Sequence, residues 1–167
     1  SIPKRMSLEE GVAEILAGAE KFLVFAPETS LPEGFDDVET VVVSSEDGDV
    51  SLPVDFERFE DRIRYGVEGA LENGLVKEGE DIVCVDNVFD TEPDTFSRFK
   101  VTESVRSGLY SLFTDSKAEP SVIRDVVELS IELGKKGQKG EPIGALFVVG
   151  DAGNVMEKSR ELSYNPF

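Results

Sequence analysis

Four carboxylates close behind one apolar run are the first residues in this sequence that could do chemistry. The run at residues 82–85 leads into Asp86 and Asn87, and three further acids follow at Asp90, Glu92 and Asp94. Carboxylates at this density could hold a hard cation such as magnesium or calcium. The spacing lacks the central glycine and closing glutamate of an EF-hand calcium loop. Because the chain has 35 acidic residues in all, we favour coincidence over a metal site.

A second candidate is a basic, glycine-bearing segment near the C-terminus. Gly137, Gly140 and Gly144 lie close to three lysines, Lys135, Lys136 and Lys139. A phosphate cradle of the Walker type needs a Gly-Lys-Ser/Thr that opens a helix, and none is present here. The glycines also do not lie between a strand and a helix start, as in a dinucleotide-binding fingerprint. We favour a helix C-cap and a solvated turn, with lysines attracted by the helix dipole.

Gly150 and Asp151 directly follow an apolar run that reads as a buried strand. Ligands bind at the carboxyl ends of parallel strands in open α/β sheets, so Asp151 is placed where a functional acid could lie. It could equally cap the N-terminus of the following helix. Of these two interpretations we favour the cap.

Cys84 is the single cysteine, and the sequence has no histidine. An internal disulfide, a Cys-His pair, a Ser-His-Asp triad and a histidine-based zinc site are therefore excluded within this chain. Any general acid or base would have to be a carboxylate, a lysine or a tyrosine. Because Cys84 lies in an apolar run, we expect a buried, inert core cysteine.

Charge is distributed unevenly along the chain. Residues 1–120 contain 28 acidic and 11 basic side chains, whereas residues 121–167 contain 7 and 6. The acidic part disfavours nucleic acid and anionic membranes as partners, and we favour a solvated acidic surface over a docking face for a basic partner. The change near Pro120 predicts a module boundary. No apolar run approaches the roughly 20 residues needed to span a bilayer, and the start is unlike a signal peptide, so we expect a soluble, cytoplasmic protein.

Apolar periodicity predicts an α/β fold with a mostly parallel sheet flanked by helices. Short continuous apolar runs predict buried strands, and 3.6-residue periodicity predicts helices between them. The expected strands are 21–26, 41–45, 82–85, an edge strand at 99–102, and 142–151. The expected helices are 7–19, 56–71 ended by Asn73-Gly74, a less regular one at 105–112, 122–133 ended by Gly134, and 155–162. We expect a turn at the acidic residues 46–49.

The C-terminal residues resemble the opening of the diadenylate cyclase domain of archaeal proteins. The similarity covers residues 127–151, including Gly-Ala-Leu-Phe-Val-Val-Gly-Asp at 144–151, and continues through 159–167 to the closing Asn-Pro-Phe. Residues 109–116 are similar to the lead-in of that domain. More weakly, residues 74–85 resemble the pyruvate-kinase C-terminal-like α/β domain that precedes the cyclase domain in these proteins. In these families such a domain is regulatory or structural, and a similar role here rests on analogy alone.

The resemblance implies a reaction that condenses two ATP molecules into cyclic di-AMP and releases two pyrophosphates, with a divalent metal, manganese or magnesium. Two cyclase domains must face each other in this reaction. The family's Asp-Gly-Ala and Arg-His segments, which bind nucleotide and metal, lie beyond Asn-Pro-Phe, and neither occurs here. No catalytic, metal-binding or ligand-binding residue is therefore assigned by resemblance. We expect a chain that is inactive alone.

This interpretation divides the chain into an acidic α/β domain at residues 1–119 and an incomplete α/β cyclase segment at residues 120–167. The expected strand at residues 145–149 is apolar on both faces and requires neighbours. The remaining cyclase half, the N-terminal sheet or a second copy of the chain could supply them. Two other functions remain open, namely a regulatory module that binds a small molecule or a protein, and an oligomerisation domain.

Overall fold

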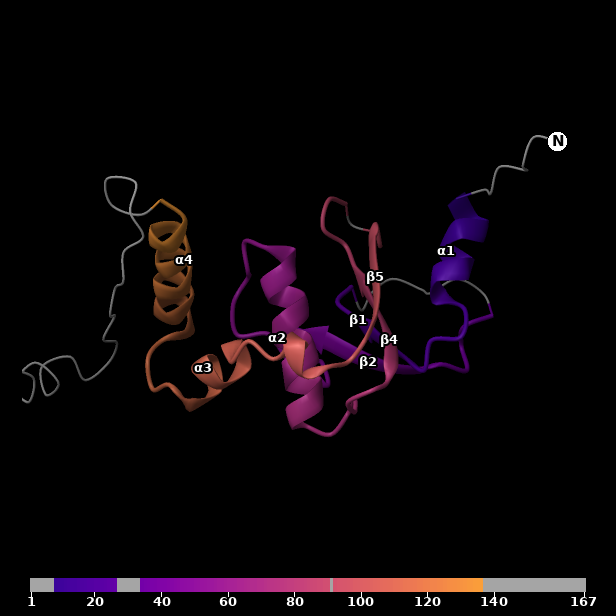
Figure 1. Cartoon of the computed structure of the whole chain (residues 1–167), viewed down its shortest axis with the longest axis horizontal. Coiled ribbons are helices and arrows are strands. Elements are labelled where there is room, and N and C mark those ends of the chain that lie inside the picture. The colour runs from indigo at the N-terminus through magenta and orange to yellow at the C-terminus, as the bar shows by residue number, and fades with distance from the viewer. Residues whose placement is uncertain (1–7, 27–33, 91, 137–167) are drawn as a thin grey trace, which may run out of the picture. The chain divides into compact units, whose positions relative to one another are not determined.

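The computed structural model describes residues 8–26, 34–90 and 92–136 (Figure 1). The chain divides into two units at residues 111 and 112. The first unit contains a five-stranded sheet in the order β3-β2-β1-β4-β5. Its strands are β1 (Lys21–Val24), β2 (Glu39–Ser44), β3 (Val50–Ser51), β4 (Asp81–Asp86) and β5 (Thr95–Lys100). The helices are α1 (Leu8–Leu16), α2 (Phe59–Glu72), the 3-10 turn η1 (Glu103–Val105), α3 (Leu109–Asp115) and α4 (Pro120–Lys136). The expected boundary at Pro120 stays a prediction.

The sheet is mostly parallel, which confirms the predicted fold class. β1 lies in the middle, where Leu23 pairs in parallel with Val41 of β2 and with Cys84 of β4. β5 runs antiparallel to β4, with Val83 opposite Arg98. The apolar runs predicted β1, β2 and β4, but they predicted neither the short strand β3 nor this pairing direction.

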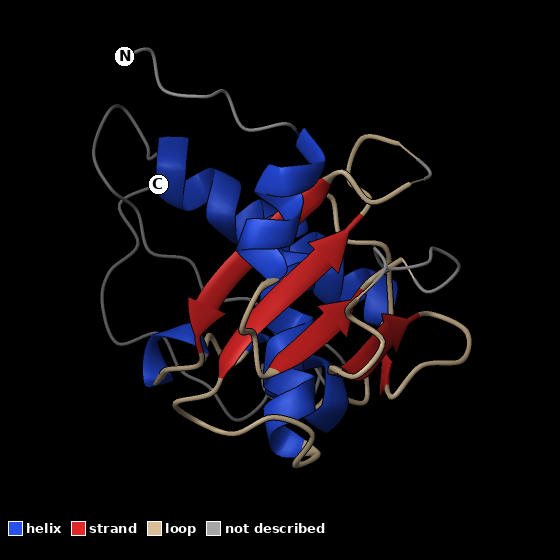
Figure 2. Ribbon diagram, turned by 90° about the vertical axis from the view of Figure 1, so that its right-hand side faces the viewer, coloured by secondary structure: helices blue, strands red, loops and turns tan. Residues whose placement is uncertain are grey.

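One face of the sheet packs against α1. Alternate residues of β1 and β4 point to this side, because successive side chains in a strand face opposite ways. The resulting buried cluster contains Leu16, Ala19, Phe22, Val24, Val83 and Val85, and Phe96 of β5 packs against it. Figure 2 shows helices on both faces of the sheet. The core of the first unit is therefore formed in two layers, one on each side.

The other face of the sheet is covered by α2, which approaches closely because it carries glycines. A Cβ atom added to Gly66 would lie 2.6 Å from the Phe25 ring, and one added to Gly69 would lie 2.6 Å from Val50. Side chains at these two positions would push the helix away from the sheet. The glycines thus fix the distance between α2 and the strands that it covers.

Several expected boundaries are wrong, each for a local reason. α2 begins at Phe59 rather than Phe56, whose ring instead packs on Tyr65 with centroids 5.5 Å apart. The expected edge strand at 99–102 is β5 at 95–100, because its pairing with β4 extends from Thr95. The expected helix at 105–112 is split into η1 and α3, since Gly108 has a φ of 78° that no helix accommodates.

The expected end of a helix at Gly134 is also wrong, because α4 continues to Lys136. A glycine inside a helix costs about 1 kcal/mol relative to alanine, which the rest of the helix can offset. The turn at residues 46–49 is confirmed, and Asp49 Oδ2 accepts a hydrogen bond of 2.8 Å from the Val42 N–H across it. The expected strand at 142–151 and helix at 155–162 lie outside the described residues.

Candidate functional site

The carboxyl ends of β1 and β4 meet at a change of direction in the sheet. From β1 the chain continues to β2 on one side, whereas β4 lies on the other side of β1. Open α/β proteins bind ligands outside such a switch point, because the chain diverges there. Asp86 ends β4 at this place, and Phe25 directly follows β1, with its N–H donating to the Val85 carbonyl at 2.8 Å. Asp86 was one of the acids singled out in the sequence.

Arg62 of α2 reaches these two strand ends. Its Nη2 donates to the Phe25 carbonyl at 3.0 Å and lies 3.4 Å from Asp86 Oδ1. Asp86 is fully buried, and its Oδ1 also accepts the Asn87 N–H at 2.8 Å. Asp86 Oδ2 and Arg62 Nε are buried and have no hydrogen-bond partner among the described residues. Such atoms are rare in folded proteins, and they mark this pair as the place where a water or a ligand group fits.

Burial dominates the electrostatics of Asp86. It raises the pKa of this carboxyl, and the positive charge of Arg62 and the Asn87 hydrogen bond only partly oppose it. The pair can orient a polar group. In the part of the chain that the structure describes, no group of three or more metal-ligating side chains comes together. The described residues therefore do not fit the divalent metal that the resemblance implies.

The other acids of this segment build a loop rather than a site. Asp94 accepts backbone N–H groups from Val88, Phe89 and Asp90 at 2.7–2.8 Å, and the Thr95 hydroxyl at 2.8 Å. These bonds lower the pKa of Asp94 against the opposing effect of its desolvation. Asp90 and Glu92 are exposed. The carboxylate of Asp94 is thus committed to holding the β4–β5 connection.

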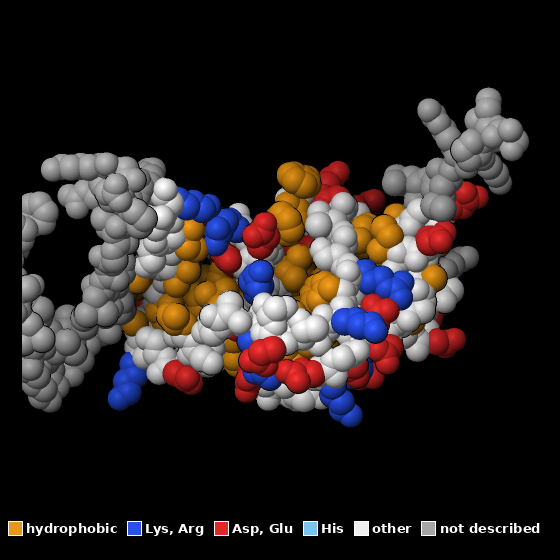
Figure 3. Space-filling model, in the orientation of Figure 1, with side chains coloured by type: hydrophobic (Ala, Val, Ile, Leu, Met, Phe, Trp, Pro, Cys, Tyr) orange, Lys and Arg blue, Asp and Glu red, His pale blue; other side chains and the backbone are white. Residues whose placement is uncertain are grey.

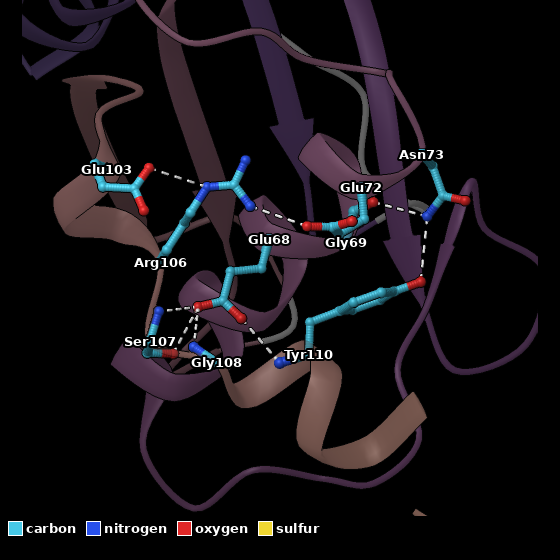
Figure 4. A network of polar contacts seen from close by, with 9 residues as sticks. All are labelled: Glu68, Gly69, Glu72, Asn73, Glu103, Arg106, Ser107, Gly108 and Tyr110. Carbon is cyan, nitrogen blue, oxygen red and sulfur yellow. Dashed lines mark hydrogen bonds and ion pairs between the residues drawn. The ribbon is translucent and has the colours of Figure 1, made fainter. Parts of the chain in front are cut away.

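A second buried carboxylate, Glu68 of α2, was not singled out in the sequence (Figure 4). It is 4 % exposed and accepts hydrogen bonds at the start of α3. The donors are the N–H and hydroxyl of Ser107, the latter at 2.7 Å, the Gly108 N–H at 3.2 Å and the Tyr110 N–H at 2.8 Å. The first N–H groups of a helix have no acceptor within that helix. Glu68 of α2 supplies an acceptor for those at the start of α3. Nothing in the sequence singled out this acid among the many acids of the chain.

Comparison with known proteins decides the family. The family described as "Diadenylate cyclase, N-terminal" matches residues 6–121. The chain belongs to this family. It is 51% identical over 168 residues to a diadenylate cyclase of Haloferax volcanii, covering 96% of this chain and 62% of that protein. It is 34% identical over 133 residues to a diadenylate cyclase of Methanocaldococcus jannaschii, covering 75% of this chain and 43% of that protein.

These comparisons confirm the archaeal diadenylate cyclase resemblance read from the sequence. The chain spans less than two thirds of the length of either relative. No solved structure shows significant similarity to it. Within the described ranges, the helices are too short or too polar to cross a bilayer.

The other residues that could take part in chemistry are either buried or lie outside the residues that the structure describes. Cys84 is 1% exposed, and burial, followed by the charge of Asp86, raises the pKa of its thiol, which confirms a buried core cysteine. Burial, and then Tyr110, raises the pKa of Tyr65 to about 12, so this phenol stays protonated at neutral pH. The basic glycine segment from Gly137 and the acid Asp151 lie outside the described residues.

The Arg62–Asp86 pair leads to a pH prediction for the variant Arg62→Met. Removing the guanidinium takes away the charge that opposes burial, so the pKa of Asp86 rises further. A carboxyl whose pKa is higher in the folded than in the unfolded state stabilises the fold below its unfolded pKa of about 4 and loses this contribution as pH rises. Arg62→Met should melt at a lower temperature than the parent chain. We expect this difference in melting temperature to grow from about pH 4 to pH 7.

Thermal unfolding followed by circular dichroism at several pH values measures this difference. Arg58→Met is the matched control, because Arg58 is the N-cap residue of the same helix and pairs with Asp61 at 2.9 Å near the surface. We expect its effect to stay below about 1 kcal/mol at all pH values. Adding Asp86→Asn to Arg62→Met should remove the pH dependence. A pH-independent loss in Arg62→Met would show that Asp86 is not the titrating group.

Proposed function

We propose that this chain is the N-terminal part of an enzyme that condenses two ATP molecules into cyclic di-AMP and releases two pyrophosphates. The observation that carries the proposal is the 51% identity over 168 residues with a diadenylate cyclase of Haloferax volcanii. The family match over residues 6–121 agrees with it. In this proposal residues 1–119 form an accessory α/β domain, and residues 120–167 begin the cyclase domain.

The chain as given would not catalyse this reaction alone. It contains no histidine and no Asp-Gly-Ala, so the segments that the family uses for nucleotide and metal are not among its 167 residues. The buried carboxylates of the described part have other tasks, since Glu68 is bonded to the start of α3 and Asp86 faces Arg62. ATP and manganese or magnesium would be used by the complete protein in the cytoplasm. The partner of this chain would be the remaining cyclase half or a second copy.

Complementation tests this proposal. The chain is incubated with ATP and manganese, either alone or fused to the cyclase segment that carries Asp-Gly-Ala and Arg-His, and cyclic di-AMP is quantified by liquid chromatography. We expect product from the fusion and none above the protein-free background from the chain alone. Product from the chain alone would overturn the assignment of the catalytic segments. A fusion that folds and binds ATP but makes no cyclic di-AMP would overturn the proposed activity.

One alternative, a module that binds a small molecule, is favoured by a specific observation. The first unit has a hollow beside α2 that is large enough for a ligand. Both roles are compatible, because a regulatory domain can precede a catalytic one.

A further inference from the structure

The hollow lies between α2, β5 and η1, and all of it belongs to the first unit. Its volume is about 510 Å³, and ten residues line it. Small-molecule sites typically measure about 300–1,000 Å³. Figure 3 shows hydrophobic side chains at the surface in the region between α2 and β5. This space is therefore of the size and character that a drug-sized molecule occupies.

The hydrophobic side chains of the hollow come from all three elements. Ile63 of α2 is buried, Phe59 at the start of the same helix is 41% exposed, and Phe99 and Val105 complete the apolar lining. A half-exposed phenylalanine beside a buried isoleucine offers an apolar surface to a planar group. An aromatic ring packed there would cover surface that is now in water, which contributes about 25 cal/mol per Å² of apolar area.

Two cations also line the hollow, in a chain whose net charge is −18. Arg64 and Lys100 form no ion pair with any residue in the described ranges. Two nearby arginines are committed, since Arg98 pairs with Asp81 at 2.7 Å and Arg106 with Glu72 at 2.9 Å. Arg64 makes only a long hydrogen bond of 3.4 Å to the Ser104 carbonyl. Arg64 is thus available to an anion from outside, whereas Lys100 also acts electrostatically on Asp81, its neighbour in β4.

Hydroxyl groups complete the polar part of the lining. Ser97, Thr102 and Ser104 line the hollow, and the hydroxyls of Thr102 and Ser104 lie 2.7 Å apart. Arginine, lysine and hydroxyl side chains are the groups that bind phosphate oxygens. Glu60 also lines the hollow and can accept a hydrogen bond from a ligand hydroxyl or amine, while its charge disfavours a long polyphosphate.

We propose that this hollow binds a nucleoside 5′-monophosphate. The base would pack on Phe59, Ile63 and Phe99, and the phosphate would be held by Arg64 and Lys100 together with the hydroxyls. The lining supports this class of ligand because it combines one apolar surface with one pair of cations in a space of about 510 Å³. The site is separate from the strand ends at Arg62 and Asp86, and it does not depend on the proposed cyclase activity.

Calorimetric titration of the chain with AMP, GMP, CMP and UMP tests the proposal. We expect saturable binding of at least one of them with a Kd below about 1 mM, and binding of its nucleoside or of inorganic phosphate at least about ten-fold weaker. Arg64→Gln and Lys100→Gln should each weaken the nucleotide by about ten-fold or more, at an unchanged melting temperature. Arg106→Gln, which removes a cation that does not line the hollow, is the control and should leave the Kd unchanged.

Three results would overturn the proposal. One is the absence of binding below about 1 mM for all four nucleotides. Another is nucleotide binding that both glutamine variants leave unchanged. The third is inorganic phosphate binding as tightly as the best nucleotide, which would leave the apolar lining without a role. Because the titration uses the chain itself, it is independent of whether cyclic di-AMP is ever formed.

Discussion

Replacing Glu68 with glutamine lowers the free energy of unfolding of the first unit by about 2–4 kcal/mol. The carboxylate accepts four hydrogen bonds at the start of α3, from Ser107, Gly108 and Tyr110. An amide has one acceptor oxygen, and its NH₂ group would face backbone N–H groups that also need an acceptor. Each buried donor left without a partner costs about 1–3 kcal/mol. Urea unfolding followed by circular dichroism and tyrosine fluorescence measures the loss.

Glu72→Gln is the matched control for this change. Glu72 lies on the same helix and in the same network (Figure 4), and its carboxylate pairs with Arg106 at 2.9 Å. Its side chain is 51% exposed, so water can replace the lost partner. We expect a loss below about 1 kcal/mol. Equal losses in the two variants would mean that the buried acid contributes no more than a surface ion pair.

Gly66→Ala destabilises the first unit by about 1–3 kcal/mol, although alanine is the better helix former. The new Cβ would lie 2.6 Å from the Phe25 ring and 3.2 Å from Val43. The Phe25 ring is 3% exposed, and the Arg62 guanidinium lies 5.8 Å from its centre, so it has little room to move. The added methyl group must therefore displace α2 or the strand. Urea unfolding detects the change as a lower midpoint.

Two further variants separate crowding from helix propensity. At Gly134 in α4 a Cβ would meet nothing within 4 Å, so Gly134→Ala should leave stability unchanged or raise it by up to about 1 kcal/mol. Combining Gly66→Ala with Phe25→Leu shortens the side chain that the methyl group would strike, and should recover part of the loss. A Gly66→Ala variant that is more stable than the parent would show that the close approach of α2 has no energetic consequence.

The sequence predicted the sheet well where burial is continuous. β4 is apolar over residues 82–85, and such a run is typical of a strand covered on both faces. β5 was misplaced by a few residues because it lies at the edge, where none of its residues is fully buried. Local periodicity carries no information on pairing direction, so it could not predict that β5 runs antiparallel to β4.

The candidate site was predicted only in part. Asp86 drew attention because it follows a strand, but its partner Arg62 lies on α2, and their proximity depends on how the helix packs on the sheet. Glu68 gave no signal, since an acid in a helix is usually on the solvated face. Its role depends on where α3 begins, which only the folded chain determines. Tertiary contacts therefore decide which of the many acids of this chain are buried and bonded.

Both outer strands of the described sheet are poorly suited to accept another strand. β3 has two residues, and β5 carries Arg98 and Lys100 among its six. Short or charged borders discourage the backbone pairing by which exposed sheets of different molecules fuse and aggregate. Any association of this unit with another copy or domain would consequently rely on side chains of its helices and loops. Such contacts can be strengthened or weakened by single substitutions while the sheet itself stays intact.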